Sequence, residues 1–108
     1  MNIFLVAIGA AVGGVTRYLI SGNPWRTLAI NVLGSFVIGL LAVVCPAKFR
    51  PLLIVGFCGG FTTFSTFSNE TLLMLKNAQY LMAGGYVLAS VVGGILAAAV
   101  GYYLGGKL

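Results

Sequence analysis

The sequence predicts an all-α membrane protein with four transmembrane helices in each subunit. Of its 108 residues, 60% are hydrophobic and only 6% are charged, and the mean hydropathy is +1.09. Soluble domains carry roughly 25% charged residues, so this composition excludes an ordinary soluble domain. A helical span needs about 20 apolar residues. The length therefore fits four spans with short loops, as a single domain over residues 1–108.

Charged and metal-ligating side chains are sparse. Six Lys and Arg residues against one acid give a net charge of +5, but they are too scattered to form a nucleic-acid-binding patch. We expect them at helix ends, near anionic lipid head groups. The two cysteines, with no histidine, match no metal or redox motif. The N-terminus lacks the basic region of a signal peptide, so we interpret the first apolar segment as a true span.

The first span is expected at about residues 2–20. Gly9 and Gly13 have the spacing that lets two helix backbones approach closely, although simple compactness of a glycine-rich chain also explains them. Arg17 lies near the end of this span. Its guanidinium either extends to the membrane interface or faces an aqueous vestibule.

The second span is expected at about residues 27–44, after a turn at residues 21–24. Trp25 and Arg26 are typical of a membrane interface. The one strongly polar side chain of this span is Asn31. It either bridges two helices by hydrogen bonds or offers an N–H to an anion, and the sequence slightly favours the bridge.

The third and fourth spans are expected at about residues 51–75 and 80–104. Pro51 suits the first position of a helix, where its missing N–H costs nothing. In the fourth span Tyr86 and Ser90 are four residues apart, so a phenol and a hydroxyl share one helical face.

The middle of the third span, residues 56–70, is unusually polar for its depth in the bilayer. It contains a glycine pair, a run of hydroxyls, two phenylalanines and the only acid of the chain. Unpaired polar groups are costly in lipid, so this stretch must face protein, water or an ion, and we interpret it as lining an ion path. Gly59 and Gly60 indicate either a helix break, whose freed carbonyls a cation could bind, or a close approach.

Two phenylalanines and the acid give this stretch its chemistry. Phe64 and Phe67 share a helical face and either pack or present their positive ring edges to an anion. Glu70 is expected to pair with Arg17 or to cap a helix. No base, nucleophile or metal cluster accompanies it, so we expect no enzyme.

The basic residues are almost evenly divided between the two membrane surfaces. With four spans, one side carries Lys48, Arg50 and Lys107, and the other carries Arg26, Lys76 and, if it reaches the surface, Arg17. Orientation normally follows a bias in this count. Its near absence favours a dual-topology protein that assembles as an antiparallel homodimer. The alternative is a fixed orientation set by lipid or by the insertion machinery.

The motifs resemble those of one known family, the Fluc-type bacterial fluoride channels (fluoride exporters). The resemblance is carried by Gly56-Phe57-Cys58-Gly59-Gly60-Phe61-Thr62-Thr63-Phe64-Ser65-Thr66-Phe67-Ser68-Asn69-Glu70. Two further motifs occur in the same order as in the family, Gly13-Gly14-x-x-Arg17-Tyr18 and Thr27-Leu28-x-x-Asn31-x-x-Gly34. The resemblance extends over essentially the whole chain.

This resemblance implies a passive channel of the bacterial cytoplasmic (inner) membrane that exports cytoplasmic fluoride. It implies a dual-topology homodimer of antiparallel subunits with two anion pores. The third helix would be broken near its middle, at the dimer centre. There, backbone carbonyls of Gly59 and Thr62 would hold a structural sodium ion.

The resemblance also assigns roles to individual side chains. The anion path would be lined by Phe64, Phe67, Asn31, Tyr86 and Ser90, and we add the hydroxyls of Ser65 and Thr66. Arg17 would lie in the vestibule, and Glu70 would be a structural or gating acid. One departure is Gly94, one turn beyond Ser90, where some family members carry another hydroxyl.

Two other functions are compatible with four short spans. A small multidrug-type proton-coupled exporter needs an acid within the first span, and residues 1–20 contain none. A non-conducting membrane assembly subunit would use the glycine pairs and Asn31 only to hold helices together, and it predicts no anion flux.

Overall fold

The computed structural model describes residues 2–108 and is helical nearly throughout. α1 (Ile3–Ile20), α2 (Pro24–Val44) and α5 (Tyr80–Gly105) are continuous helices. The third span combines η1 (Ala47–Phe49), the wider π-helical η2 (Pro51–Cys58), α3 (Gly59–Phe61) and α4 (Phe64–Lys76). By length and composition, four helices of the described chain can cross a membrane. The predicted all-α architecture with four such helices is confirmed.

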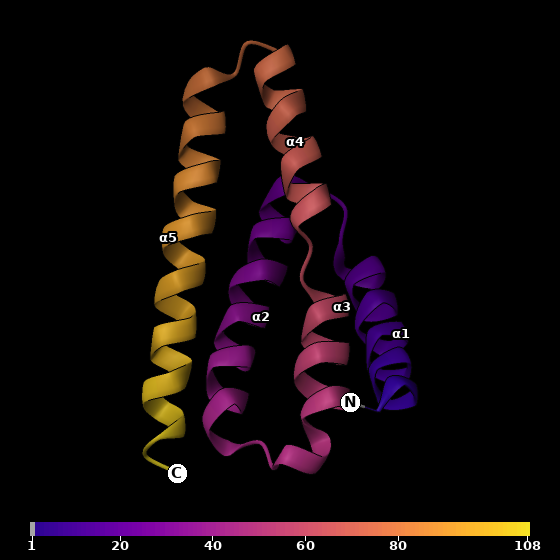
Figure 1. The fold of residues 1–108 in the computed structure, drawn as a ribbon. Coiled ribbons are helices and arrows are strands. Elements are labelled where there is room, and N and C mark those ends of the chain that lie inside the picture. Colours follow the sequence, from indigo (N-terminus) through magenta and orange to yellow (C-terminus); the bar gives the residue numbers. More distant parts are fainter. Residues whose placement is uncertain (1) are drawn as a thin grey trace.

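The helices form an open row rather than a closed bundle. α5 packs along α2, α2 contacts η2, and η2 and α3 pack along α1 (Figure 1). Within residues 2–108, the two helices at the ends of the row, α1 and α5, do not contact each other. Both termini and the connection from α2 to η2 lie toward the same end, as an even number of spans requires (Figure 1).

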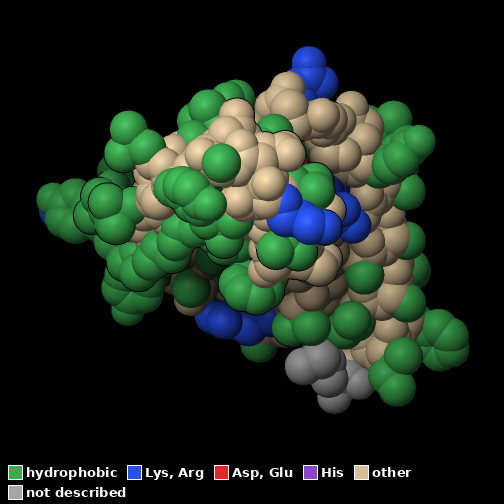
Figure 2. Space-filling view, turned by 90° about the horizontal axis from the view of Figure 1, so that it is seen from above, with side chains coloured by type: hydrophobic (Ala, Val, Ile, Leu, Met, Phe, Trp, Pro, Cys, Tyr) green, Lys and Arg blue, Asp and Glu red, His purple; other side chains and the backbone are tan. Residues whose placement is uncertain are grey.

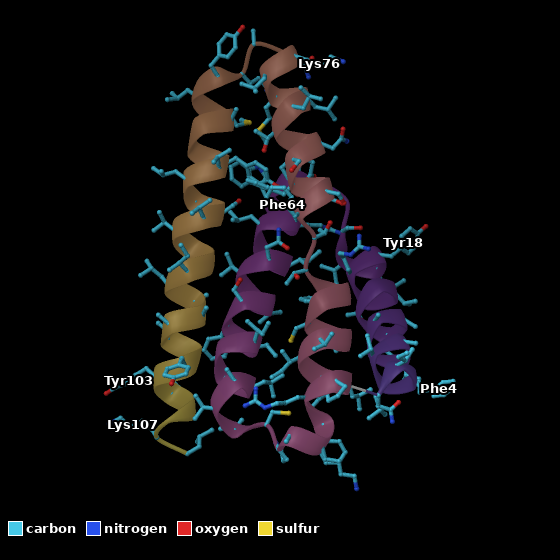
Figure 3. All side chains as sticks on the ribbon, in the orientation of Figure 1. Phe4, Tyr18, Phe64, Lys76, Tyr103 and Lys107 are labelled. Carbon is cyan, nitrogen blue, oxygen red and sulfur yellow. The ribbon has the colours of Figure 1, made fainter. Side chains whose placement is uncertain are left out.

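The outer surface of this row is apolar. Phe4 and Tyr18 point away from the molecule on the outer side of α1 (Figure 3), and each is more than three-quarters exposed. From the end that carries the α4–α5 connection, Lys and Arg side chains form separate patches among hydrophobic side chains (Figure 2). Such a surface suits contact with lipid or with another apolar protein surface.

The second helix begins at Pro24, three residues earlier than the expected start at residue 27. The reason is that the preceding turn supplies an N-cap residue, directly followed by a proline suited to the first helical position. Asn23 Oδ1 accepts a hydrogen bond from the Arg26 N–H at 2.9 Å, and Pro24 occupies the first helical position. The Arg26 side chain donates back to the Ile20 carbonyl at 3.3 Å, at the end of α1.

Two glycines set the distance between α1 and the third span. A Cβ added at Gly9 would collide with the Leu52 carbonyl oxygen, and one added at Gly13 would collide with that of Phe57. Of the two explanations for this pair, close backbone approach is therefore the one that the structure confirms.

The third span is interrupted at Thr62 and Thr63, which have extended backbone (φ −79°, ψ 155° and φ −146°, ψ 121°). The glycine pair itself is not the point of interruption, because both Gly59 and Gly60 lie in α3. Gly60 instead allows close approach, since an added Cβ would lie 2.6 Å from the Ala10 carbonyl oxygen.

The interruption is held by the side chain of Asn31 from α2. Asn31 Nδ2 donates to the Thr63 carbonyl at 3.0 Å, and the Thr63 N–H donates to Asn31 Oδ1 at 2.8 Å. The amide thus pairs with both backbone groups of one residue, as a neighbouring peptide would. Of the two interpretations of Asn31, the structure confirms the bridge.

The close approach at Gly13 predicts that alanine destabilises the protein much more at Gly13 than at the neighbouring Gly14. We expect Gly13→Ala to destabilise the protein by about 1–3 kcal/mol, since the methyl group must displace the Phe57 backbone. Gly14→Ala is the matched control, because a Cβ there meets no atom within 4 Å. Thermal melting of the purified proteins in detergent measures the effect. Equal melting temperatures for the two variants would contradict this packing.

The Asn31 bridge predicts a second stability effect. Asn31→Leu preserves the approximate volume but leaves the Thr63 N–H and carbonyl without partners, so we expect a loss of about 1–3 kcal/mol for each group. Asn69→Leu, on the exposed face of α4, serves as the control. Melting temperature is again the measurement. A variant as stable as the control would show that the bridge does not hold the interruption.

Candidate functional site

A cavity of about 330 Å³ lies beside the interruption, between α2, α5 and the third span. Its lining is Asn31, Gly34, Ser35, Ile38, Thr62, Thr63, Phe64, Phe67, Ser90 and Val91. Five of the residues predicted to form the site, Asn31, Thr62, Phe64, Phe67 and Ser90, therefore meet in one place. The other predicted residues lie outside this lining.

Most polar groups of the lining are already hydrogen-bonded. The Thr62 hydroxyl donates to the Cys58 carbonyl at 3.0 Å. The Thr63 hydroxyl donates to Thr66 Oγ at 3.2 Å and accepts from the Thr66 N–H at 3.3 Å. Ser90 Oγ, in contrast, is buried and has no hydrogen-bond partner among the described residues. A buried hydroxyl without a partner is costly, so this atom has capacity for a ligand or water in the cavity.

Two aromatic rings of the cavity lining, Phe64 and Phe67, belong to a series of rings that continues outside the lining. The Phe64 and Phe67 ring centroids are 5.8 Å apart with their planes inclined by 49°, and Phe67 lies 5.2 Å from Tyr86. Trp25 meets the Tyr86 ring edge to face at 6.4 Å. Tyr86 is completely buried, whereas Phe64 is 78% exposed. The side chain of Phe64 lies at the level where α4 begins (Figure 3). From Tyr86 through Phe67 to Phe64, the rings therefore run from a buried core to an open surface.

The only acid of the chain lies beyond these rings. Tyr86 Oη donates to Glu70 Oε1 at 3.0 Å, and Glu70 borders a second cavity of about 420 Å³ that Trp25 and Met74 also line. The expected pairing of Glu70 with Arg17 is wrong. The two residues lie on α4 and α1, which do not contact each other in the described chain.

Arg17 has a different partner. Its Nε donates to the Gly60 carbonyl at 3.3 Å, at the C-terminal end of α3. A cation is favourable at that end of a helix, because the unpaired carbonyls carry partial negative charge. Arg17 is half-buried and satisfies a carbonyl at the end of α3.

Ser65 and Thr66 lie at the start of α4, outside the cavity lining. Ser65 Oγ is 3.5 Å from Thr63 Oγ, and Thr66 forms the two bonds with Thr63 described above. The cap of α4 is the Thr63 hydroxyl, and the Ser65 and Thr66 hydroxyls lie within hydrogen-bonding distance of it. Their assignment to the anion path stays a prediction.

Gly59 and Thr62, the residues expected to hold a cation, both lose the usual helical partner of their carbonyl groups. The N–H that would reach the Gly59 carbonyl in a continuous helix is that of Thr63, and it donates to Asn31. The corresponding N–H for Thr62 belongs to Thr66 and donates to Thr63 Oγ. Carbonyl oxygens are suitable ligands for a hard cation, so the donor set fits. Among residues 2–108, no group of three His, Cys, Asp or Glu side chains offers another metal site.

Sequence reasoning missed two residues of this site. Thr63 forms both the bridge to Asn31 and the cap of α4, but its partner lies 32 residues away, and no sequence spacing indicates that contact. Ser35 lines the cavity one turn beyond Asn31. Its four-residue spacing from Asn31 was the signal available for it.

The chain is similar to known proteins over nearly its whole length. The family model described as CrcB-like protein, Camphor Resistance (CrcB), matches residues 4–102. A protein of Leptospira interrogans, named fluoride-specific ion channel FluC, is 44% identical over 95% of this chain and 93% of its own length. Proteins with the same name from Magnetococcus marinus and Hydrogenobaculum sp. are 41% and 40% identical and cover 97% and 100% of this chain, and 98% and 100% of their own lengths.

These relatives are named as ion channels, not as enzymes, so the expectation of a non-enzymatic protein is confirmed. With its four apolar helices, the chain is a multi-pass membrane protein. Because the family model and the relatives both match nearly its whole length, the chain belongs to the CrcB family of FluC-type fluoride channels.

Proposed function

We propose that this chain forms a passive, fluoride-selective channel through which cytoplasmic fluoride leaves the cell across the bacterial inner membrane. The observation that carries the proposal is the cavity at Thr62 and Thr63. It places an unpartnered buried hydroxyl, that of Ser90, beside two phenylalanine rings within an apolar span. The printed name of the relatives, fluoride-specific ion channel, supports the choice of anion.

The chemistry of the cavity suits a small anion. Fluoride holds its hydration shell tightly, so a selective path must replace water with donors and positive ring edges placed close together. The Ser90 hydroxyl is one such donor, and the Phe64 and Phe67 rings, which also line the cavity, would present their positive edges to the anion. Such a path needs no energy source. Fluoride that enters as neutral HF ionises in the cytoplasm, and the anion leaves down its electrochemical gradient.

The functional unit is an antiparallel homodimer with two pores. One copy leaves the path open, because its helices form a row and Phe64 is 78% exposed beside the cavity. A second copy related by a twofold axis in the membrane plane would cover this surface and duplicate the path. The near-even division of Lys and Arg between the two ends supports insertion in both orientations.

A structural sodium ion lies between the two subunits in this proposal. The interruption of the third span would meet its counterpart at the dimer centre, and the Gly59 and Thr62 carbonyls of both copies would hold the ion. The support is the loss of their helical N–H partners to Asn31 and Thr63. Gly59 is also exposed, with open space where a Cβ would be. The ion would supply a positive charge that satisfies these carbonyls in the membrane.

Fluoride efflux from liposomes that contain only this protein tests the channel. With a potassium ionophore present, we expect rapid fluoride release at a fluoride electrode and little chloride release from matched vesicles. Phe64→Ile should lower fluoride release at least about tenfold, because loss of an ion contact of about 1.4 kcal/mol corresponds to that factor.

Phe4→Ile is the control for this variant, since Phe4 is as exposed as Phe64 (80% against 78%) but lies on the outer side of α1. Its efflux should equal that of the unmodified protein. Efflux unchanged in both variants would keep the channel and assign Phe64 to packing. An absence of fluoride release from folded, unmodified protein would exclude the channel.

The sodium site predicts a dependence of stability on one cation. An ion bound only by the folded state stabilises it by about 2.7 kcal/mol at a concentration one hundred times its Kd. We expect the melting temperature of the purified protein to rise with sodium chloride and to stay constant with choline chloride. Potassium chloride shows whether the site selects by ion size. Identical melting curves in sodium and choline would contradict a sodium site.

A further inference from the structure

We propose that the hydroxyl of Ser35 is a second donor to the ion in the cavity and acts at the level of Gly94, where α5 has no side chain. The proposal rests on the proposed function, since it names a residue that contacts the permeating anion. In this proposal α2 has two roles. Asn31 supports the interruption, and Ser35 supplies a donor to the ion path.

Geometry places Ser35 opposite the bare position on α5. Ser35 and Ser90 both line the cavity. A Cβ built at Gly94 would lie 3.5 Å from Ser35 Oγ, and this hydroxyl is among the nearest atoms to that position. Gly94 follows Ser90 by one helical turn, a rise of about 5.4 Å. The Ser35 hydroxyl, on α2, therefore lies at the level of Gly94, one helical turn beyond Ser90.

The hydrogen bonds of the lining explain why this hydroxyl matters. Asn31 pairs with both backbone groups of Thr63, and the hydroxyls of Thr62 and Thr63 donate within the third span. Ser90 is then the buried donor with unused capacity. An ion that moves from Ser90 along the cavity next reaches the level of Gly94. The hydroxyl near that level is the one of Ser35.

Two substitutions together move this hydroxyl from α2 to α5. Ser35→Ala removes one oxygen, and Ala favours the helix, so the variant should fold. Gly94→Ser adds a hydroxyl from the opposite helix, and its Cβ has ordinary van der Waals distance to Ser35. The double variant carries the hydroxyl on α5 alone. Ser21→Ala, between α1 and α2 and outside the cavity lining, is the control.

Fluoride efflux from liposomes compares these proteins, with melting temperatures measured beside it. We expect Ser35→Ala to lower efflux about tenfold, which corresponds to about 1.4 kcal/mol. Its melting temperature should match that of the control. Adding Gly94→Ser should restore efflux to within about threefold of the unmodified protein, because the donor returns to the same level of the cavity. This recovery would not follow if Ser35 served only to pack helices.

The outcomes separate the two proposals. Efflux from the unmodified protein together with unchanged efflux from Ser35→Ala would overturn the role of Ser35 and leave the channel intact. Reduced efflux that Gly94→Ser fails to restore would also overturn it, because the effect would then not depend on a donor at this level. An absence of efflux from the unmodified protein would refute the channel itself.

Discussion

The pair of hydrogen bonds between Asn31 and Thr63 is the interaction on which the rest of this structure depends. A helix that ends inside a membrane leaves N–H and carbonyl groups without water to satisfy them. The Asn31 amide supplies both a donor and an acceptor at the residue that leaves the helix. It therefore stabilises two extended residues at a depth where lipid alone would enforce a continuous helix.

The same interruption creates the site. Between the end of α3 at Phe61 and the second turn of α4, the chain brings two threonines and two rings into the cavity beside α2 and α5, namely Thr62, Thr63, Phe64 and Phe67. Arg17 satisfies a carbonyl at the end of α3, and Thr63 caps the start of α4. Within the described chain, the Ser90 hydroxyl is buried without a hydrogen-bond partner.

The open row of helices gives the second constraint. Close packing at Gly9 and Gly13 joins α1 to the third span, and α5 lies along α2, but nothing in residues 2–108 joins the two ends of the row. The cavity consequently has an exposed aromatic border at Phe64. In the proposed dimer this border is the surface that the second copy would cover. The absence of contact between α1 and α5 thus connects the helix arrangement with the exposed border that the proposed dimer covers.

The sequence by itself determined the features that depend on local composition. Apolar segment length gave the four helices, and the spacing of Gly9 and Gly13 gave a close contact. The polar run at residues 56–70 marked the region of the cavity. The start of α2 at Pro24 was also readable from Asn23 and Pro24, although it was placed three residues late.

Only the tertiary structure decided that the interruption lies at Thr62 and Thr63 and not at the glycine pair. It also decided that Glu70 pairs with Tyr86 and not with Arg17. The physical reason is that each depends on a hydrogen-bond partner from another helix. Asn31 is 32 residues from Thr63, and Tyr86 is 16 residues from Glu70. No periodicity within one helix specifies which distant side chain will satisfy a buried polar group; the packing of the row does.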